Sequence, residues 1–326
     1  MPAITATYKN QISRFQSLIA LIILCVVLSI RTDTFLTADN GLNVLRQTAV
    51  NICIATGMTL IVLTAGIDLS VGSVLALCGA IAAGLLKNGI KIPSADLFIG
   101  FTVLGVVLAG IFIGALLGFF NGLVITKFKV PPFVATLAML TIARGFTLLY
   151  TNGQPISNLG PDFAVIGTGW WLGIPVPVWI AAGVVLFAVF ITQQTKLGRY
   201  IYAIGGNETA AKFSGINITK VKITVYAIAG ALAAIGGIIV TSRLDSAQPD
   251  AGTNYELNAI AAVVIGGTSL SGGKGTVWGA VMGAIIIGVL NNGLVLLNVS
   301  AFWQQVVKGG VILLAVIIDK LGEKKE

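Results

Sequence analysis

The sequence of 326 residues contains no histidine, and only 10% of its residues are charged. The absence of histidine excludes histidine metal ligands, nucleophiles activated by histidine and histidine proton relays. The small charged fraction argues against a soluble enzyme, because soluble domains carry about 25% charged residues. Cysteine is also scarce: Cys25, Cys53 and Cys78 each fall within an apolar run, and their spacing fits no metal site. We expect them to be small hydrophobic side chains packed between helices.

What the sequence contains instead is apolar residues, at 56% of the total, with a mean hydropathy of +0.96. Because about 20 apolar residues in a row cross a bilayer as a helix, we predict an all-α polytopic membrane protein. We expect about ten transmembrane helices in a single domain, residues 1–326. The candidate spans are residues 15–30, 48–66, 71–86, 98–122, 132–150, 174–192, 223–241, 257–271, 276–298 and 302–319.

Three of these spans, residues 15–30, 71–86 and 257–271, are short enough to be half-spans or re-entrant segments. Residues 15–30 are followed by no small-residue cleavage site. We therefore interpret them as the first helix and not as a signal peptide.

The orientation follows from the positions of the basic residues. With the N-terminus inside, thirteen of the twenty lysines and arginines fall in cytoplasmic segments and five in external ones. Short cytoplasmic loops of membrane proteins are enriched in lysine and arginine. The distribution therefore predicts that both termini are cytoplasmic, and the net charge of +8 needs no nucleic-acid partner.

Glycines recur at helical spacing within two spans. Gly110, Gly114, Gly118 and Gly122 follow one another every four residues, and a later span repeats the spacing once with Gly279 and Gly283. Such stripes allow helix backbones to approach closely inside a bilayer. We expect these glycines to pack helices together and not to contact a substrate.

Two polar segments between apolar spans resemble each other. Residues 66–72 and 267–273 both fit Gly-x-[Asp/Ser]-Leu-Ser-x-Gly. An internal repeat, as in many transporters, and a chance match in a glycine-rich chain are both open. The second segment also resembles a phosphate-binding loop at Gly273-Lys274, but Thr268 occupies the position of the first glycine and Gly275 follows the lysine. We therefore expect no nucleotide site in this chain.

Six polar residues within or beside the spans are candidates for a translocation pathway. We expect Asp68 to cap the helix that follows it, and the alternative is a role in a gate or pathway. Arg144 lies deep in its span. Three roles are open for it: its long side chain extends to the outer surface, it pairs with an acid, or it lines a polar route. Asparagine amides suit sugar hydroxyls, although they more often hold helices together. The candidates are Asn51, Asp68, Asn121, Arg144, Asn291 and Asn292.

Two external segments are long enough to have a role of their own. Residues 151–173 contain Trp170 and Trp171, which fit an interfacial aromatic belt. Residues 242–256 are polar and mildly acidic, and we expect them to offer a surface to a soluble partner outside.

The longest polar loop, residues 193–222, carries five basic residues and one acid, Glu208. Within it, residues 205–216 predict a short helix, because Glu, Ala and Lys favour helices and Gly215 suits the position after a helix end. The segment resembles the Glu-Ala-Ala coupling loop of ABC importer permeases, with Thr209 interrupting that pattern.

The whole chain resembles the permease subunits of ribose-type ABC importers. The matching stretches are residues 66–73, 198–208, 214–217, 246–249, 255–257 and 266–270. The resemblance implies two permease protomers, a tandem-domain ATPase that holds ATP and Mg, and a periplasmic sugar-binding protein, all at a bacterial inner membrane. The permease would not be an enzyme itself. By position, the ATPase-coupling residues would be Gly206, Asn207, Glu208, Ala210, Ala211 and Gly215.

The identity of the sugar and the energy source for transport rest on different observations. Ribose follows from the resemblance alone, and xylose, galactose and autoinducer-type sugars stay open. The alternative mechanism is an ion-coupled secondary sugar transporter, which would require acids or bases inside the membrane, and the spans contain few of them. A scaffold that transports nothing would have little use for ten spans with polar breaks.

Overall fold

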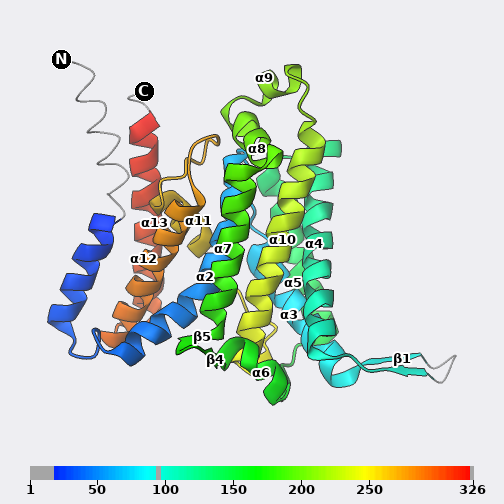
Figure 1. Cartoon of the computed structure of the whole chain (residues 1–326), viewed down its shortest axis with the longest axis vertical. Coiled ribbons are helices and arrows are strands. Elements are labelled where there is room, and N and C mark those ends of the chain that lie inside the picture. Colours follow the sequence, from blue (N-terminus) through cyan, green and yellow to red (C-terminus); the bar gives the residue numbers. More distant parts are fainter. Residues whose placement is uncertain (1–17, 93–96, 324–326) are drawn as a thin grey trace.

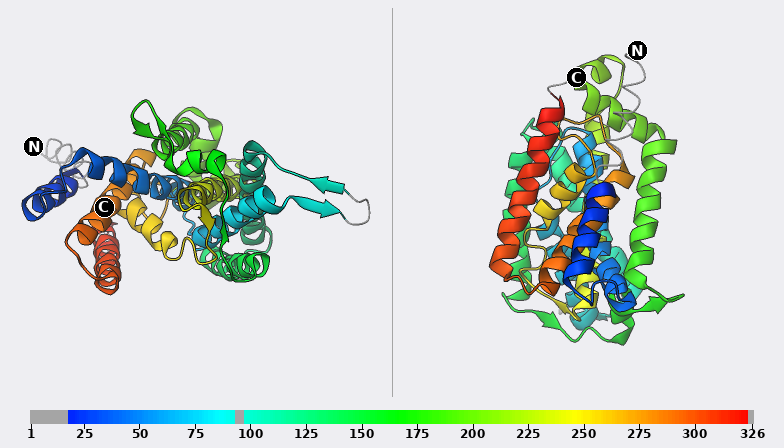
Figure 2. Two further views of the ribbon diagram at one scale, coloured as in Figure 1. Left: turned by 90° about the horizontal axis from the view of Figure 1, so that it is seen from below. Right: turned by 90° about the vertical axis from the view of Figure 1, so that its left-hand side faces the viewer.

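The computed structural model describes residues 18–92 and 97–323. Within them, long apolar helices stand side by side in one elongated bundle (Figure 1). Residues 15–17 of the first candidate span lie outside the described residues, as do parts of the predicted domain 1–326 at both ends. Seen from below, helix Leu18–Arg31 and the C-terminal helix lie at one end of the bundle, and a β-hairpin projects from the other (Figure 2).

Seven described helices are long and apolar enough to cross a membrane. They are α2 (Ala38–Leu63), α3 (Val71–Asn88), α4 (Val103–Lys127), α5 (Pro132–Thr151), α7 (Val176–Gln194), α10 (Ile218–Arg243) and α12 (Val277–Leu296). Three further apolar helices are shorter: Leu18–Arg31, α11 (Tyr255–Ile265) and the stretch Ala301–Ile317 of α13 (Ala301–Glu323). The all-α polytopic class is confirmed, whereas about ten crossings and the sides of the termini stay predictions.

The ends of the helices explain where the predicted boundaries differ. Helix α2 begins ten residues before the predicted span 48–66, because the side chain of Thr37 accepts the N–H of Asn40 and caps a polar first turn that hydropathy overlooks. Thr102 caps α4 in the same way through Gly105. Residues 71–86, predicted as a short segment, form most of the 18-residue α3.

Helix α10 lies in the middle of the bundle and packs against α4 through glycines (Figure 1). A Cβ on Gly118 would overlap the carbonyl oxygen of Tyr226, and a Cβ on Gly114 would overlap that of Gly230. Gly283 approaches the carbonyl of Ala262 and holds α12 against α11. The predicted packing role of both glycine stripes is confirmed.

The two spans that contain Cys53 and Cys78 bury these thiols completely in the main apolar core, as predicted for small hydrophobic side chains. Cys25 is half-buried, and all three cysteines are free.

The short strands and one short helix lie at the end of the bundle opposite to α9 (Figure 1). Strand β1 (Ile90–Ile92) pairs with β2 (Leu97–Ile99), and β4 (Trp170–Trp171) with β5 (Ile174–Pro175). Strand β3 (Ile156–Ser157) pairs with β6 (Ser246–Ala247), and helix α6 covers Pro161–Thr168. The opposite end carries α8 (Lys196–Gly206) and α9 (Glu208–Phe213), and α13 ends on that side as well.

We predict that Gly118→Ala destabilises the protein, because its Cβ would collide with the backbone of α10. The expected loss is about 1–3 kcal/mol of unfolding free energy, the usual cost of overpacking. Thermal unfolding of the purified protein in one detergent measures it. Gly145→Ala is the matched control, because nothing lies within 4 Å of a Cβ at that position. Equal midpoints for the two variants would contradict the packing role of the stripe.

Candidate functional site

The polar segment 193–222 folds into two helices where one was predicted. The predicted short helix is α9, which begins after Asn207 and ends at Phe213. The Asn207 side chain accepts the N–H of Ala210 at 2.9 Å and caps the helix. Gly215 has a φ of +81° and donates its N–H to the carbonyl of Lys212, while Ile216 donates to Ala211. This hydrogen-bond pair requires a left-handed residue, so the predicted position of Gly215 just after the end of the helix is confirmed.

Helix α8 was not predicted, although the sequence contains its signal. Ile201 and Ile204 lie on one helical face and are fully buried, whereas Lys196 and Arg199 carry charge on the same helix. Such amphipathic spacing indicates a helix that lies on a protein surface. The Thr195 side chain accepts the N–H of Gly198 and caps it. Helix α8 thus holds α9 at the end of the bundle.

The predicted coupling residues divide into an exposed group and one anchor. Gly206, Asn207, Glu208, Ala210 and Gly215 are exposed. Ala211 is buried and packs in the core under α8 and α10. The neighbouring Phe213, which the sequence analysis passed over, is 88% exposed. Aromatic residues are enriched at protein interfaces, so Phe213 is a candidate contact residue, and its signal in the sequence is an aromatic within the polar loop.

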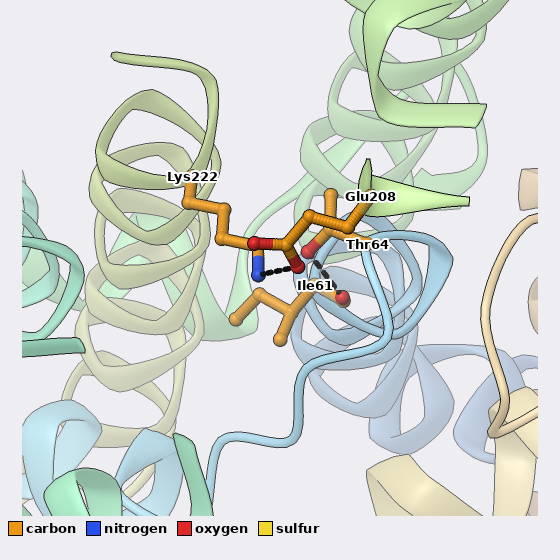
Figure 3. A network of polar contacts seen from close by, with 4 residues as sticks. All are labelled: Ile61, Thr64, Glu208 and Lys222. Carbon is orange, nitrogen blue, oxygen red and sulfur yellow. Dashed lines mark hydrogen bonds and ion pairs between the residues drawn. The ribbon is translucent and has the colours of Figure 1, made fainter. Parts of the chain in front are cut away.

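An ion pair fastens α9 to α10. The ammonium of Lys222 lies 2.7 Å from a carboxylate oxygen of Glu208, with Lys222 13% and Glu208 53% exposed (Figure 3). Thr64 and Ile61, at the end of α2, lie beside the pair in the same view. A half-exposed ion pair contributes at most about 1 kcal/mol to the free energy of unfolding. Its main effect is therefore to fix the orientation of α9 relative to α10.

Behind α9, three chain segments meet at what we call the inner junction, formed by Leu63, Tyr202, Gly205, Gly273 and Gly275. The N–H of Gly273 donates to the carbonyl of Leu63 at 3.0 Å, and the Tyr202 hydroxyl donates to the carbonyl of Gly275 at 2.9 Å. A side chain on Gly205 would collide with Leu63 and Gly273. Movement of α8 must therefore reach the end of α2 and the loop before α12.

Between α2 and α3 the chain leaves the helix, and most of this segment is buried or partly buried, with Ala65 exposed. Ala65, at a φ of +57°, ends α2, and the N–H of Leu69 donates to the Thr136 hydroxyl at 3.1 Å. The Tyr226 hydroxyl donates to the carbonyl of Ile67 at 3.4 Å. Non-helical backbone survives inside a membrane protein only where such partners replace water. We call residues 64–70 the α2–α3 break.

Asp68 and Asn121 meet at this break. Asp68 is 2% exposed and accepts hydrogen bonds from the N–H and the hydroxyl of Ser70, at 2.7 and 2.6 Å. The Asn121 amide of α4 donates to the same hydroxyl at 3.0 Å. The prediction that Asp68 caps the first turn of α3 is wrong, because Ser70 is itself the N-cap residue and its side chain makes no cap hydrogen bond. The carboxylate instead shapes the break.

The other pathway candidates lie apart from this pair. Asn292 exchanges two hydrogen bonds with Asn40, at 2.8 and 3.1 Å, and so joins α12 to α2. The buried side-chain oxygen of Asn291 has no hydrogen-bond partner among the described residues, and Asn51 is half-buried on α2. The six candidates therefore do not converge on one site, and their pathway role stays a prediction.

Arg144 of α5 reaches the polar segment 242–256. Its guanidinium donates to the carbonyl of Pro249 at 2.5 Å and lies near the carboxylates of Asp250 and Glu256. The same segment packs against α3, where Gly252 and Gly72 touch backbone to backbone. Residues 242–256 are thus partly folded into the bundle and are not entirely a surface loop.

Residues 242–256 are also joined to the segment 151–173. The hydroxyls of Ser157 and Ser246 lie 2.8 Å apart, and the N–H of Leu159 donates to the Asp245 carboxylate at 2.8 Å. Trp170 and Trp171 are exposed, as expected of an interfacial belt, and Arg46 lies over the Trp170 ring at 5.0 Å. Among the described residues, no group of three acidic or cysteine side chains could hold a metal ion.

We predict that Thr136→Val destabilises the α2–α3 break, because valine keeps the shape and removes the acceptor of the Leu69 N–H. An unsatisfied buried donor costs about 1–3 kcal/mol. Thr141→Val on the same helix is the control, since that hydroxyl is exposed and bonds only within α5. Thermal unfolding in detergent compares the two, and a loss as large for Thr141→Val would refute the assignment.

Comparisons with known proteins agree with this architecture. The profile of the family described as the permease component of branched-chain amino acid transport systems matches residues 40–316. The chain is 53% identical to the ribose import permease protein RbsC of Haemophilus influenzae, over 97% of this chain and 99% of that protein. It is 50% identical to RbsC of Escherichia coli K12 (93% and 92% covered) and 39% identical to the D-allose transport system permease protein AlsC of the same strain (93% and 90%).

No solved structure matches the chain. The family profile spans nearly all of the bundle, and the relatives are similar over almost their whole length. The resemblance to importer permeases drawn from the sequence is thereby confirmed. The chain belongs to the family of permease components of branched-chain amino acid transport systems.

Proposed function

We propose that this chain is the membrane-spanning permease subunit of an ATP-driven importer of a pentose-like sugar, with ribose as its cargo. One observation carries the proposal: relatives named as ribose import permeases share 50–53% identity over more than nine-tenths of both chains. Relatives named for xylose or D-allose are less similar, at 35–39% identity. The ion-coupled alternative is not favoured, because the full-length relatives are transport-system permeases.

The proposed assembly holds the ATPase on the side of α9. Both termini would be cytoplasmic, as the excess of basic residues on that side predicts, in a multi-pass protein of a bacterial inner membrane. A tandem-domain ATPase would carry ATP and Mg, a periplasmic sugar-binding protein would deliver the cargo, and a second permease protomer would complete the pore. This chain would be one permease domain, with segment 193–222 as its coupling element.

The mechanism we infer is alternating access driven through α9. The exposed residues Asn207, Glu208 and Phe213 would contact the ATPase. When the ATPase closes on ATP, its push on α9 would pass to α10 through the Glu208–Lys222 pair. The inner junction would transmit the same displacement to the end of α2 and the loop before α12, because the backbone of Gly205 is in direct contact with Leu63 and Gly273.

The cargo would pass near Arg144, where charged and carbonyl groups lie at a polar, partly exposed face. Sugar hydroxyls donate and accept hydrogen bonds, so they suit a guanidinium beside Asp250 and Glu256. Asp68 and Asn121 are fully buried and already satisfied, so we assign them to shaping the α2–α3 break. Asn292 and Asn40 likewise hold α12 to α2.

We predict that ribose uptake into proteoliposomes requires this chain, the ATPase, the binding protein and ATP together. Collapse of ion gradients with ATP intact should leave uptake unchanged, because the driving force lies in the ATPase. Labelled ribose accumulation measures this, with xylose and allose as competitors. Uptake by the chain alone along an ion gradient would overturn the proposal in favour of a secondary transporter.

We predict that Phe213→Asp weakens docking of the ATPase, because it replaces an exposed aromatic anchor with a charge. Loss of an aromatic hot spot lowers affinity roughly tenfold or more. The measurement is the amount of ATPase that co-purifies with the permease. Phe98→Asp is the matched control, since Phe98 is also exposed but lies in the hairpin at the opposite end. Equal recovery from both variants would exclude Phe213 from the interface.

A further inference from the structure

A groove runs along the outside of α10 beside α4. Its volume is about 810 Å³, and it is open along its length. It is lined by α10 on one side and by Ala115 and Phe119 of α4 on the other. The groove begins at the end of the bundle that carries α9 and continues toward the middle of the helices.

The lining changes in character from one end of the groove to the other. Near α9 it is polar, with Thr219, Lys220 and Thr224, whereas Ala227 and Ala231 leave an apolar channel further along α10. Small side chains at these positions create the hollow, since each alanine removes most of the volume that a leucine would fill.

Lys220 supplies a cation at the polar end. It is exposed, and within the described residues the single ion pair joins Lys222 to Glu208, so the ammonium of Lys220 has no carboxylate partner. Its backbone N–H is satisfied by the Asn217 side chain, and its carbonyl accepts the Thr224 hydroxyl. The free ammonium is therefore available to an external anion.

The dimensions of the groove match one leaflet of a bilayer. The 26 residues of α10 extend about 39 Å, longer than a hydrocarbon core of about 30 Å, so its first turn reaches the headgroups. The twelve residues from Lys220 to Ala231 are separated by eleven steps of 1.5 Å, about 16 Å in all, which is close to half of that core. The ammonium of Lys220 thus lies at the depth of the lipid headgroups, and the apolar channel beside it is about as long as one acyl chain.

We propose that this groove binds an anionic phospholipid of the cytoplasmic leaflet, with its phosphate at Lys220 and one acyl chain along Ala227 and Ala231. The order of charge, hydroxyls and apolar surface along the groove is the order of chemical groups along such a lipid. A zwitterionic lipid would match the channel and carry no net charge for Lys220. The lipid site itself does not depend on the proposed transport function, whereas the choice of leaflet and the link to the coupling element rest on it.

Occupancy would steady the first turn of α10. Lys222, which holds α9 through Glu208, lies two residues from Lys220 on the same turn. A bound phosphate would reduce the motion of that turn and so of the base from which α9 projects. Anionic lipid is thereby inferred to be a structural partner of the coupling element.

The test is native mass spectrometry of the purified full-length protein titrated with phosphatidylglycerol or phosphatidylcholine. Wild type should retain phosphatidylglycerol preferentially. Lys220→Gln should lower that affinity about fivefold, the effect of one basic residue at an anionic surface, and should leave phosphatidylcholine binding unchanged. Ala227→Phe should fill the channel and reduce binding of both lipids. Lys212→Gln, which removes an exposed lysine of α9 outside the groove, is the control.

Two results would overturn the proposal. One is unchanged phosphatidylglycerol binding by Lys220→Gln, a surface change that leaves the packing of α10 intact. The other is efficient cross-linking between copies of Ala227→Cys in membranes, which would assign the groove to a second copy of this chain. Loss of the lipid preference in Lys220→Gln together with its retention in Lys212→Gln would support the site.

Discussion

The rest of this structure depends on one constraint: a backbone polar group buried inside a membrane protein needs a partner. The α2–α3 break meets it with side chains from other helices. Thr136 accepts the N–H of Leu69, and Tyr226 donates to the carbonyl of Ile67. Because those partners come from α5 and α10, the break can exist only when the bundle is assembled. Broken helices are therefore positioned by the same contacts that hold the bundle together.

Helix α10 links the packing of the bundle to segment 193–222. Its Tyr226 lies against Gly118 of α4 and also supports the break with its hydroxyl. One end of the helix holds α9 through Lys222. A rigid helix that touches α4, the break and α9 can pass a displacement between them without any new contact. Rigid elements with tight backbone contacts are the physical basis for coupling between distant sites.

The glycines of the inner junction add a second connection. A hydrogen bond from Gly273 to the last residue of α2 satisfies a carbonyl that would otherwise be unpaired at the helix end. The absence of side chains at Gly205 and Gly273 lets three backbones meet. Residues 66–72 and 267–273 have similar sequences, and each lies just after a helix, α2 or α11. In both places a left-handed residue follows the helix end, Ala65 after α2 and Gly267 after α11. The left-handed residue precedes the first motif and is the first residue of the second, so an internal repeat and a chance match both stay open.

Local patterns predicted much of this molecule correctly. Apolar runs located the long helices, four-residue glycine spacing located the face of α4 that packs against another helix, and Gly215 located the end of α9. These features depend on residues close together in the chain, so their physics is visible in a short window of sequence. The start of α2 and the presence of α8 were missed because polar first turns and short amphipathic helices lower the average hydropathy.

The sequence by itself determined the class of the protein, the position of helix α9 and the glycines that let helices approach. Only the tertiary structure decided the partners of the polar residues. Asn292 binds Asn40 across 252 positions, Arg144 reaches Pro249 across 105, and Asp68 shapes a break and does not cap α3. No local rule selects these partners, because a hydrogen bond requires a distance near 3 Å that only the packed helices impose.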